Sequence, residues 1–444
     1  MTRLCIRGGR VIDPSQRLDA RVDLLLVDGR VADWGRDLDV DPATTEILEV
    51  PPTAVVCPGF VDLHVHLREP GGEHKETIAT GARAAAAGGF TSVCAMPNTD
   101  PPIDDPAAVG FVRAAGLRAE GARVYPVGAA SVGRQGKQMT EIGELVQAGA
   151  VAVSDDGAPI ADAGLMRRLL EYTQNFGIPV LNHCEEPTLS AGGVVNEGLV
   201  STRLGLRGIP NAAEDVMVAR DIALAELTGG RVHICHVSTR GAVEFLRLAK
   251  AKGLPVTAEV TPHHLALTEE AVVGYRTEYK TNPPLRTAED VAAVRAALVE
   301  GIIDCVATDH APHHYEEKER EFDDAPFGVV GLETALGVCL RELVEPGLLD
   351  LAGLIDRLAC RPARIVPLPE GTGTLRRGAP ADVTVFDPRA RVVVDPNRFY
   401  SRSRNTPFAG WELPGRVLWT VVGGRVVHWG VAEREASTRA AMGR

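Results

Sequence analysis

The sequence predicts an α/β protein: a (β/α)8 TIM barrel joined to a small composite β-sandwich domain built from both termini. Short apolar runs recur between residues 54 and 309, and helical stretches separate most of them. Both ends of the chain instead alternate apolar and polar residues around turn signals. Strands separated by helices are typical of a parallel barrel, whereas strict alternation is typical of half-buried strands.

The two ends of the chain are expected to form one small domain. Residues 4–34 alternate around Asp28-Gly29, a pair suited to a hairpin turn, and residues 381–428 do the same around Gly423-Gly424. Because neither end has many strands, we expect the two to pair. The predicted domains are residues 1–55 and 369–430 for the sandwich, 56–368 for the barrel and 431–444 for a flexible tail.

Eight apolar, β-rich runs are expected to form the barrel strands. Several are almost continuously apolar, which suits a parallel sheet buried on both faces. Helical stretches such as 79–89 and 163–177 lie between them, and each ends at a glycine suited to a C-cap. The runs are 54–66, 90–96, 123–129, 150–155, 178–184, 231–238, 255–260 and 304–309.

Composition excludes several classes of function. The net charge of −12 and the pI near 5.5 argue against a nucleic-acid partner. The N-terminus has no apolar core of a secretory signal, and the longest apolar runs are too short to span a membrane. The eight cysteines show no CxxC spacing and mostly lie in apolar runs, so we expect free thiols and a cytoplasmic protein.

Polar side chains follow the predicted barrel strands where these end. The carboxyl ends of parallel barrel strands open on one face, the face on which barrel enzymes place their active sites. Imidazole and carboxylate groups are ligands for zinc and related ions, so the sequence predicts a metal site on this face. The residues concerned are His64, His66, Asp155, Asp156, His183, His236 and Asp309.

The remaining histidines are interpreted one by one. His233 is expected to lie on the opposite side of its strand from His236 and to face the helices. His310, His313 and His314 follow Asp309 closely, so a role in the site stays open for them. Structural roles are expected for His74, His263, His264 and His428.

Nine motifs resemble those of the bacterial class I dihydroorotases of the amidohydrolase superfamily. The resemblance runs from about residue 8 to about residue 425, and PARI (362–365) and ADVTVFDP (381–388) resemble the composite β-domain of amidohydrolases. The nine are PGFVDLHVHLREPG (58–71), AMPNT (95–99), SDDG (154–157), NHCE (182–185), HVST (236–239), TPHHL (261–265), NPPLR (282–286), ATDHAPH (307–313) and GLET (331–334).

The resemblance implies a zinc centre of one or two ions per subunit. His64, His66 and Asp309 would hold one ion, and His183 and His236 a second. Related enzymes bridge the ions with a carboxylated lysine, but the fourth predicted strand has no lysine. An aspartate takes this role in the class I subtype; the motif places it at Asp156, with Asp155 as the alternative.

The resemblance also implies a set of substrate contacts. Arg68, Asn98 and His313 would clamp an exocyclic carboxylate beside His66, since a guanidinium matches the two oxygens of a carboxylate. The ring amides would be contacted by Asn282, Phe327 and Gly328.

The implied activity is that of a dihydroorotase. It would reversibly cyclise N-carbamoyl-L-aspartate to (S)-dihydroorotate in pyrimidine biosynthesis, with metal-bound hydroxide opening the ring and Asp309 as general base and acid. A homodimer is expected, and the resemblance allows aspartate carbamoyltransferase as a partner. The alternatives are an allantoinase or dihydropyrimidinase, and a non-catalytic subunit of such a complex. The sequence leaves open whether the charged loop 315–327 is ordered only when a substrate or partner binds.

Overall fold

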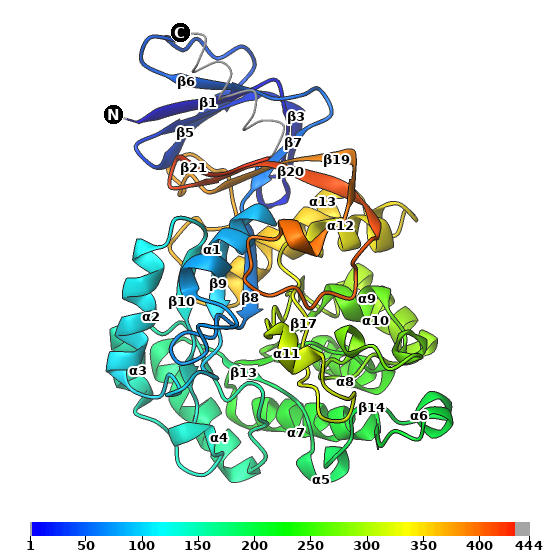
Figure 1. Ribbon diagram of the computed structural model, residues 1–444. Helices are drawn as coiled ribbons and strands as arrows, with labels where there is room; N and C mark the ends of the chain where they lie inside the picture. The colour runs from blue at the N-terminus through cyan, green and yellow to red at the C-terminus, as the bar shows by residue number, and fades with distance from the viewer. Residues whose placement is uncertain (1, 431–444) are drawn as a thin grey trace.

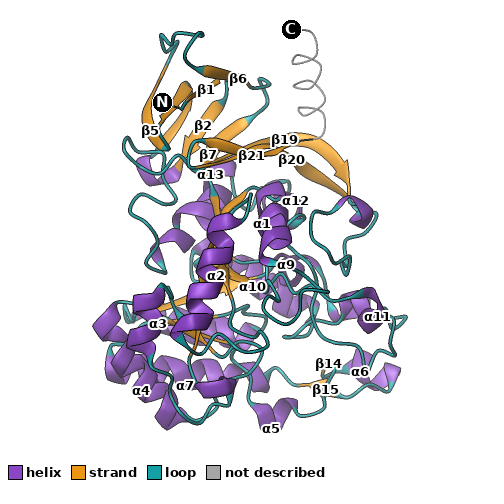
Figure 2. Ribbon diagram, turned by 60° about the vertical axis from the view of Figure 1, so that its left-hand side comes forward, coloured by secondary structure: helices purple, strands orange, loops and turns teal. Residues whose placement is uncertain are grey.

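The computed structural model describes residues 2–430 and consists of a helix-wrapped barrel with a β-sandwich at one end (Figure 1). Figure 2 shows the strands of the sandwich above the helices of the barrel. The predicted fold class is confirmed, whereas the predicted tail 431–444 lies outside the described residues. Within the described part, no helix is both long and apolar enough to cross a membrane.

Two sheets form the sandwich. The smaller has the order β5-β4-β1-β6, and the larger, β21-β20-β19-β7-β2-β3, combines strands from both ends of the chain. Its central pairing is antiparallel between β19 and β7, with Val383 opposite Pro58. The strands are β1 (Arg3–Arg7), β2 (Arg10–Asp13), β3 (Leu18–Arg21), β4 (Asp23–Val27), β5 (Arg30–Gly35), β6 (Glu46–Glu49), β7 (Val55–Pro58), β19 (Val383–Val393), β20 (Glu412–Val422) and β21 (Arg425–Trp429).

Parallel strands form the barrel, and their ring is closed by backbone contacts. One sheet has the order β10-β9-β8, and the other runs β11-β12-β13-β16-β17-β18. A parallel bridge between Val65 and His310 joins the first strand to the chain after the last. The strands are β8 (Phe60–Val65), β9 (Phe90–Ala95), β10 (Arg123–Pro126), β11 (Gly128–Ala129), β12 (Val153–Ser154), β13 (Val180–Asn182), β16 (Val232–Ile234), β17 (Val256–Val260) and β18 (Cys305–Val306).

The apolar run 54–66, expected as one strand, is divided between the two domains. Its first part is β7 of the sandwich, and its second part is β8 of the barrel. Gly59 lies between them, and a Cβ at this position would lie 2.1 Å from Oγ1 of Thr91. Only glycine allows this close approach of the chain to β9, so the connection between the domains is short and tightly packed.

Helices cover the outside of the barrel. Apolar side chains such as Leu170, Val180 and Leu246 fill the layer between helices and strands, while Leu63, Cys94 and Cys235 belong to a separate cluster inside the ring. The helices are α1 (Ile78–Ala87), α2 (Pro106–Arg118), α3 (Ile142–Ala148), α4 (Ala163–Thr173), α7 (Ala212–Thr228), α8 (Arg240–Ala251), α9 (Pro262–Ala266), α10 (Ala288–Glu300), α12 (Ala335–Cys339) and α13 (Leu351–Ile355).

Two excursions leave the barrel at its carboxyl face. The first, after β13, contains α5 (Pro187–Ser190), α6 (Leu199–Leu204) and a ribbon of β14 (Val195–Asn196) and β15 (Gly208–Ile209). The second is the charged loop 315–327, which begins with α11 (Tyr315–Lys318). Two buried lysines hold this loop: Lys280 donates to the carbonyl oxygens of Phe322 and Asp323, and Lys318 to those of Pro326 and Gly328. In this structure the loop is therefore fixed by bonds within the chain.

Candidate active site

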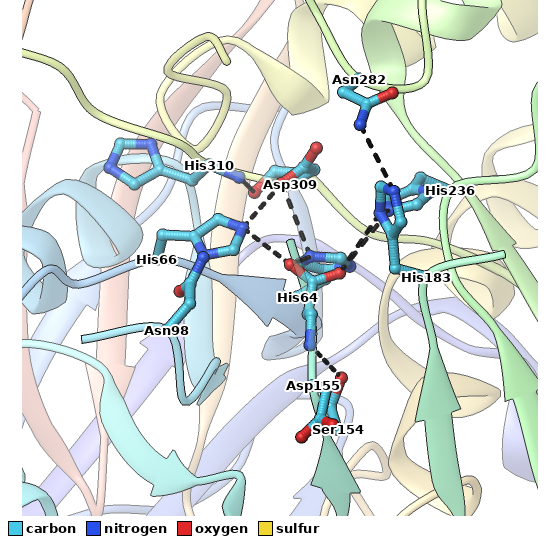
Figure 3. Close-up of polar contacts among 12 residues, drawn as sticks. His64, His66, Asn98, Ser154, Asp155, His183, His236, Asn282, Asp309 and His310 are labelled. Atoms are coloured by element: carbon cyan, nitrogen blue, oxygen red, sulfur yellow. Dashed lines mark hydrogen bonds and ion pairs between the residues drawn. The ribbon is translucent and has the colours of Figure 1, made fainter. Parts of the chain in front are cut away.

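Six buried side chains meet at the carboxyl ends of the barrel strands. Figure 3 shows His66 and Asn98 on one side and His183, His236 and Asn282 on the other, with His64 between them. Oδ1 of Asp309 lies 3.0 Å from Nε2 of His66 and 3.5 Å from Nε2 of His64. The six are His64, His66, Asp156, His183, His236 and Asp309.

Asp156 lies between the two groups of histidines. Its Oδ2 is 3.3 Å from Nε2 of His64 and 3.4 Å from Nε2 of His66. Its Oδ1 is 3.8 Å from Nδ1 of His183 and 3.7 Å from Nε2 of His236. Each carboxylate oxygen thus faces one pair of imidazoles, as a bridge between two ions requires.

Asp155 points elsewhere. Its Oδ1 accepts a hydrogen bond of 2.9 Å from the backbone N–H of Ser131, and its Oδ2 accepts one from the Ser131 hydroxyl. These bonds hold the turn that follows β11. Of the two neighbouring aspartates, only Asp156 is among the histidines of the site.

The donor set fits a divalent metal ion. Several buried polar atoms of the described residues have no hydrogen-bond partner, and three of them belong to this cluster: His64 Nε2, Asp156 Oδ1 and His236 Nδ1. Such orphaned polar atoms are rare in protein interiors because their desolvation is not compensated. Four sets of possible ligand atoms among the described residues lie within 4.8 Å of one another, and two of them consist of predicted ligands: His64, Asp156 and His236, and His64, His66 and Asp309. Imidazole nitrogen with carboxylate oxygen suits zinc and similar ions.

The charges in this cluster stabilise one another. Burial alone would lower the pKa of His64, but the carboxylates of Asp156 and Asp309 outweigh it and raise that pKa well above its ordinary value. Burial likewise raises the pKa of Asp156 and of Asp309, yet the nearby histidines, His64 first, hold both below the ordinary range. Both carboxylates are therefore ionised at neutral pH, the form in which they can bind a cation.

Hydrogen bonds behind the site orient the first two histidines. Nδ1 of His64 lies 2.8 Å from Oε1 of Glu259, and Nδ1 of His66 lies 2.7 Å from Oδ1 of Asn98. A carboxylate or amide oxygen accepts, so each Nδ1 carries the proton and each Nε2 is directed at the centre. Burial raises the pKa of Glu259, but hydrogen bonds from His233 and His64 lower it to about 2.

His233 faces the inside of the barrel, so its expected orientation toward the helices is wrong. Its Nε2 lies 3.0 Å from Oε2 of Glu259, which makes a buried chain from His233 through Glu259 to His64. Its neighbour Cys235 belongs to the apolar cluster within the ring, whereas Val232 and Ile234 pack against the helix layer. His233 thus supports a candidate ligand.

Replacing Glu259 by glutamine is expected to weaken metal binding by ~10–100-fold, the usual cost of losing an outer hydrogen-bond partner of a metal ligand. The amide cannot serve as the charged acceptor between His64 and His233. Titration of the variant with zinc against a competing chelator measures the change. Glu342→Gln, which removes the ion pair with Arg295 outside the barrel, is the control and should bind zinc like the unmodified protein.

Two candidate substrate residues stand side by side at the rim of the site. Arg68 donates from Nε to the carbonyl oxygen of Pro312, and its Nη2 lies 3.3 Å from Nε2 of His313. Burial lowers the pKa of Arg68 to about 10, so the guanidinium stays charged at neutral pH. Arg68, His236 and Asp309 all have positive φ (60°, 34° and 48°), an uncommon backbone conformation that clusters at functional sites.

The other predicted substrate contacts differ in the hydrogen bonds that they already make within the chain. Nδ2 of Asn282 lies 3.4 Å from Nε2 of His183. The carbonyl oxygen of Phe327 lies 2.8 Å from Nε2 of His313. Gly328 donates its N–H to the carbonyl oxygen of Lys280, and its own carbonyl oxygen accepts two bonds. A direct contact from Gly328 to a ligand therefore requires an exchange of partners.

Glu185 is a site residue that the sequence interpretation missed. Its Oε2 lies 3.2 Å from Nε2 of His183, and with Asn282 and Phe327 it lines a cleft of about 630 Å³ beside the histidines. The signal was a carboxylate two positions after His183 in the NHCE motif. By contrast His310, which stayed open as a candidate, points away from the cluster in Figure 3 and lies 3.3 Å from Glu76.

Comparison with known proteins identifies the family. A family model described as dihydro-orotase-like matches residues 53–242. The chain is 54% identical over 425 residues to a dihydroorotase of Pelotomaculum thermopropionicum, which covers 96% of this chain and 98% of that protein. It is 55% identical over 427 residues to a dihydroorotase of Anaeromyxobacter dehalogenans, with the same coverage.

Among solved structures, an L-hydantoinase (dihydropyrimidinase) from Arthrobacter aurescens superposes with a TM-score of 0.86 at 25% identity, over 97% of both chains. A dihydropyrimidinase from Brevibacillus agri superposes with a TM-score of 0.84 at 23% identity, over 97% of this chain and 95% of that one, and supports the fold. The barrel, the cluster of histidines and aspartates at its rim and the close relatives agree: the chain belongs to the dihydroorotase family, within the amidohydrolase superfamily.

Proposed function

We propose that this protein is a dihydroorotase of the bacterial class I type, which interconverts (S)-dihydroorotate and N-carbamoyl-L-aspartate in pyrimidine biosynthesis. The observation that carries the proposal is the position of Arg68 and His313 at the rim of the cluster formed by the histidines, Asp156 and Asp309. A cation beside a hydrolytic centre suits a cyclic amide with an exocyclic carboxylate. The relatives named dihydroorotase support the same substrate.

The proposed metal is zinc, one or two ions per subunit. His64, His66 and Asp309 would hold one ion and His183 and His236 the other, with Asp156 between them. When bound, such an ion polarises the amide carbonyl and lowers the pKa of water. The orphaned atoms of His64 and Asp156 support this assignment. The absence of a lysine from the fourth strand supports the class I subtype.

Asp309 is the proposed general base and acid. In ring opening, water attacks the ring amide carbon, Asp309 accepts a proton from that water, and the same proton passes to the nitrogen as the C–N bond breaks. The nearby histidines hold the pKa of Asp309 low, so its carboxylate is ionised at neutral pH, the form that a general base requires. The reverse path closes the ring and releases water. Cyclisation takes up a proton overall, so lower pH favours it.

The substrate clamp is proposed to consist of Arg68, Asn98 and His313, with His66 beside them. Asn98 already binds His66, so a carboxylate held by this clamp would lie next to a metal ligand. Asn282, Phe327 and Gly328 are proposed to contact the ring amides. Gly328 can contact the ring only if it exchanges its hydrogen-bond partners. Of the three contacts, that of Gly328 therefore depends most on the conformation of the charged loop that ends just before it.

A hydrolysis assay with a substrate panel tests the proposed function. The purified protein should open dihydroorotate, lose activity with its metal on chelation and recover both with zinc. Substrates without the exocyclic carboxylate, such as dihydrouracil and hydantoin, should react poorly. Preference for these or for allantoin would instead identify a dihydropyrimidinase or an allantoinase. A metal-loaded protein inactive on all substrates would be a non-catalytic subunit.

Arg68→Ala is expected to raise KM for dihydroorotate by roughly 30-fold or more, because loss of a buried, charge-paired contact costs about 2 kcal/mol or more. Turnover at saturation should fall less, since Asp309 remains in place. Steady-state kinetics in the ring-opening direction measure both values. Arg123→Ala, which removes an ion pair with Asp382 away from the site, is the control. An unchanged KM in Arg68→Ala would remove Arg68 from the clamp.

The proposal extends to assembly and location. We propose a homodimer in the cytoplasm, with aspartate carbamoyltransferase as a partner. The eight cysteines are all buried and unpaired, which suits a reducing compartment. Light scattering of the purified protein, alone and mixed with the transferase, tests both assemblies.

A further inference from the structure

The segment between β19 and β20 extends from the sandwich to the rim of the barrel. It is the orange-red chain in Figure 1 that descends from the sandwich and then returns to it. The Ser403 hydroxyl donates to the carbonyl oxygen of Lys75, and the Ser401 hydroxyl donates to Glu76. The connection between β19 and β20 thus reaches the loops around the candidate active site.

Asn405 connects this segment to two stretches of the barrel rim. Its Oδ1 accepts a hydrogen bond of 3.1 Å from the N–H of His313. Its Nδ2 donates to the carbonyl oxygen of Ala311 at 3.0 Å and to that of Gly328 at 3.1 Å. Its backbone oxygen accepts from the N–H of Val330 at 2.9 Å. The residue is only 5% exposed, and its side-chain amide uses both donors and its acceptor.

These bonds join the two stretches of chain that carry the proposed substrate contacts. Ala311 to His313 form the rim next to Arg68, which donates to the carbonyl oxygen of Pro312. Phe327 ends the charged loop and Gly328 follows it. The carbonyl oxygen of Phe327 lies 2.8 Å from Nε2 of His313. Asn405 therefore fixes the backbone on both sides of the contact between His313 and Phe327.

We propose that Asn405 is a positioning residue that sets the substrate clamp, acting through His313 and Gly328 without touching the substrate. This inference rests on the proposed dihydroorotase function. The chemistry requires one acceptor and two donors on one short, flat side chain, which an asparagine provides. Aspartate would place a carboxylate against two carbonyl oxygens. Alanine would leave the His313 N–H and the Ala311 carbonyl oxygen without these partners, and the Gly328 carbonyl oxygen with Lys318 alone.

The test is the KM of Asn405→Ala for dihydroorotate in the metal-loaded protein. Because the clamp moves while the metal ligands stay, KM should rise roughly tenfold, with kcat reduced less and metal content unchanged. Asn405→Asp is the second variant, with the same expected direction, should the alanine variant not fold. Asn196→Ala is the matched control: Asn196 is equally buried and bonds Glu269 and Arg286, so its loss should lower thermal stability without changing KM.

A double-mutant cycle separates positioning from general destabilisation. If Asn405 acts through His313, Asn405→Ala should raise KM less in His313→Ala than in the unmodified protein, because only the part that acts through Gly328 remains. Fully additive effects, or a KM within twofold of the unmodified protein in both folded Asn405 variants, would overturn the proposal while leaving the dihydroorotase function standing. An unmodified, metal-loaded protein without activity on dihydroorotate would overturn both.

Discussion

Asp309→Asn is expected to reduce kcat for dihydroorotate by at least ~10²-fold, the lower range of what general acid–base catalysis contributes. The asparagine keeps the shape of the side chain but cannot take a proton from water or return it to the ring nitrogen. Its amide also loses the charge that lies 3.0 Å from His66. The measurement is kcat in both directions with metal content determined on the same sample.

A matched control is the aspartate just before β18, the strand that Asp309 follows. Asp304 accepts bonds from Lys250 and from the N–H of Ala258, on the side of the barrel away from the histidines. Asp304→Asn should lower stability and leave kcat near that of the unmodified protein. Near-full kcat in Asp309→Asn at normal metal content would show that another group moves the proton.

Asp156→Asn is expected to weaken metal binding by more than the ~10–100-fold caused by loss of an outer hydrogen-bond partner. Asp156 has one oxygen toward each pair of imidazoles, and its charge, together with that of Asp309, holds the pKa of His64 high. Without that charge, the second ion would be held only by the neutral imidazoles of His183 and His236, with no carboxylate shared with the first ion. Metal stoichiometry after dialysis against graded chelator concentrations measures the loss, and activity should fall with it.

Asp155→Asn is the comparison for this prediction. Asp155 bonds Ser131 and lies outside the cluster, so its variant should retain the metal and lose only stability of the turn after β11. The opposite pattern, with metal lost from Asp155→Asn and retained by Asp156→Asn, would assign the bridge to Asp155. The two aspartates are adjacent in sequence, but their side chains point in different directions. Comparing the variants therefore separates contact with the cluster from position in the chain.

That the site residues come together was predictable, because a parallel barrel places the carboxyl ends of all its strands on one face. His64, His183 and Asp309 are far apart in sequence, yet the strand pattern alone brings them together. The side on which His233 lies was not predictable by counting from His236. Strand β16 ends at Ile234, and the positive φ of His236 breaks the alternation on which that count relied.

Other parts of the site had weaker signals. Glu259 is a charged residue within a buried apolar strand, a pattern that indicates a paired carboxylate, but its partners His64 and His233 come from other strands. Asn405 had no local signal, because its role depends on a contact between the sandwich segment and the barrel rim. The order of the charged loop depends likewise on Lys280 and Lys318, which are buried against backbone oxygens.

The pairing of β7 with β19 has a consequence for synthesis of the chain. β7 is made before the first barrel strand, and β19 after the last. The larger sheet therefore cannot close until the chain has been synthesised through β19, after all of the barrel strands, and until then the edge of β7 that pairs with β19 stays unpaired. Asn405 follows β19 in the chain, so the rim around His313 reaches its final form only after every barrel strand has been made.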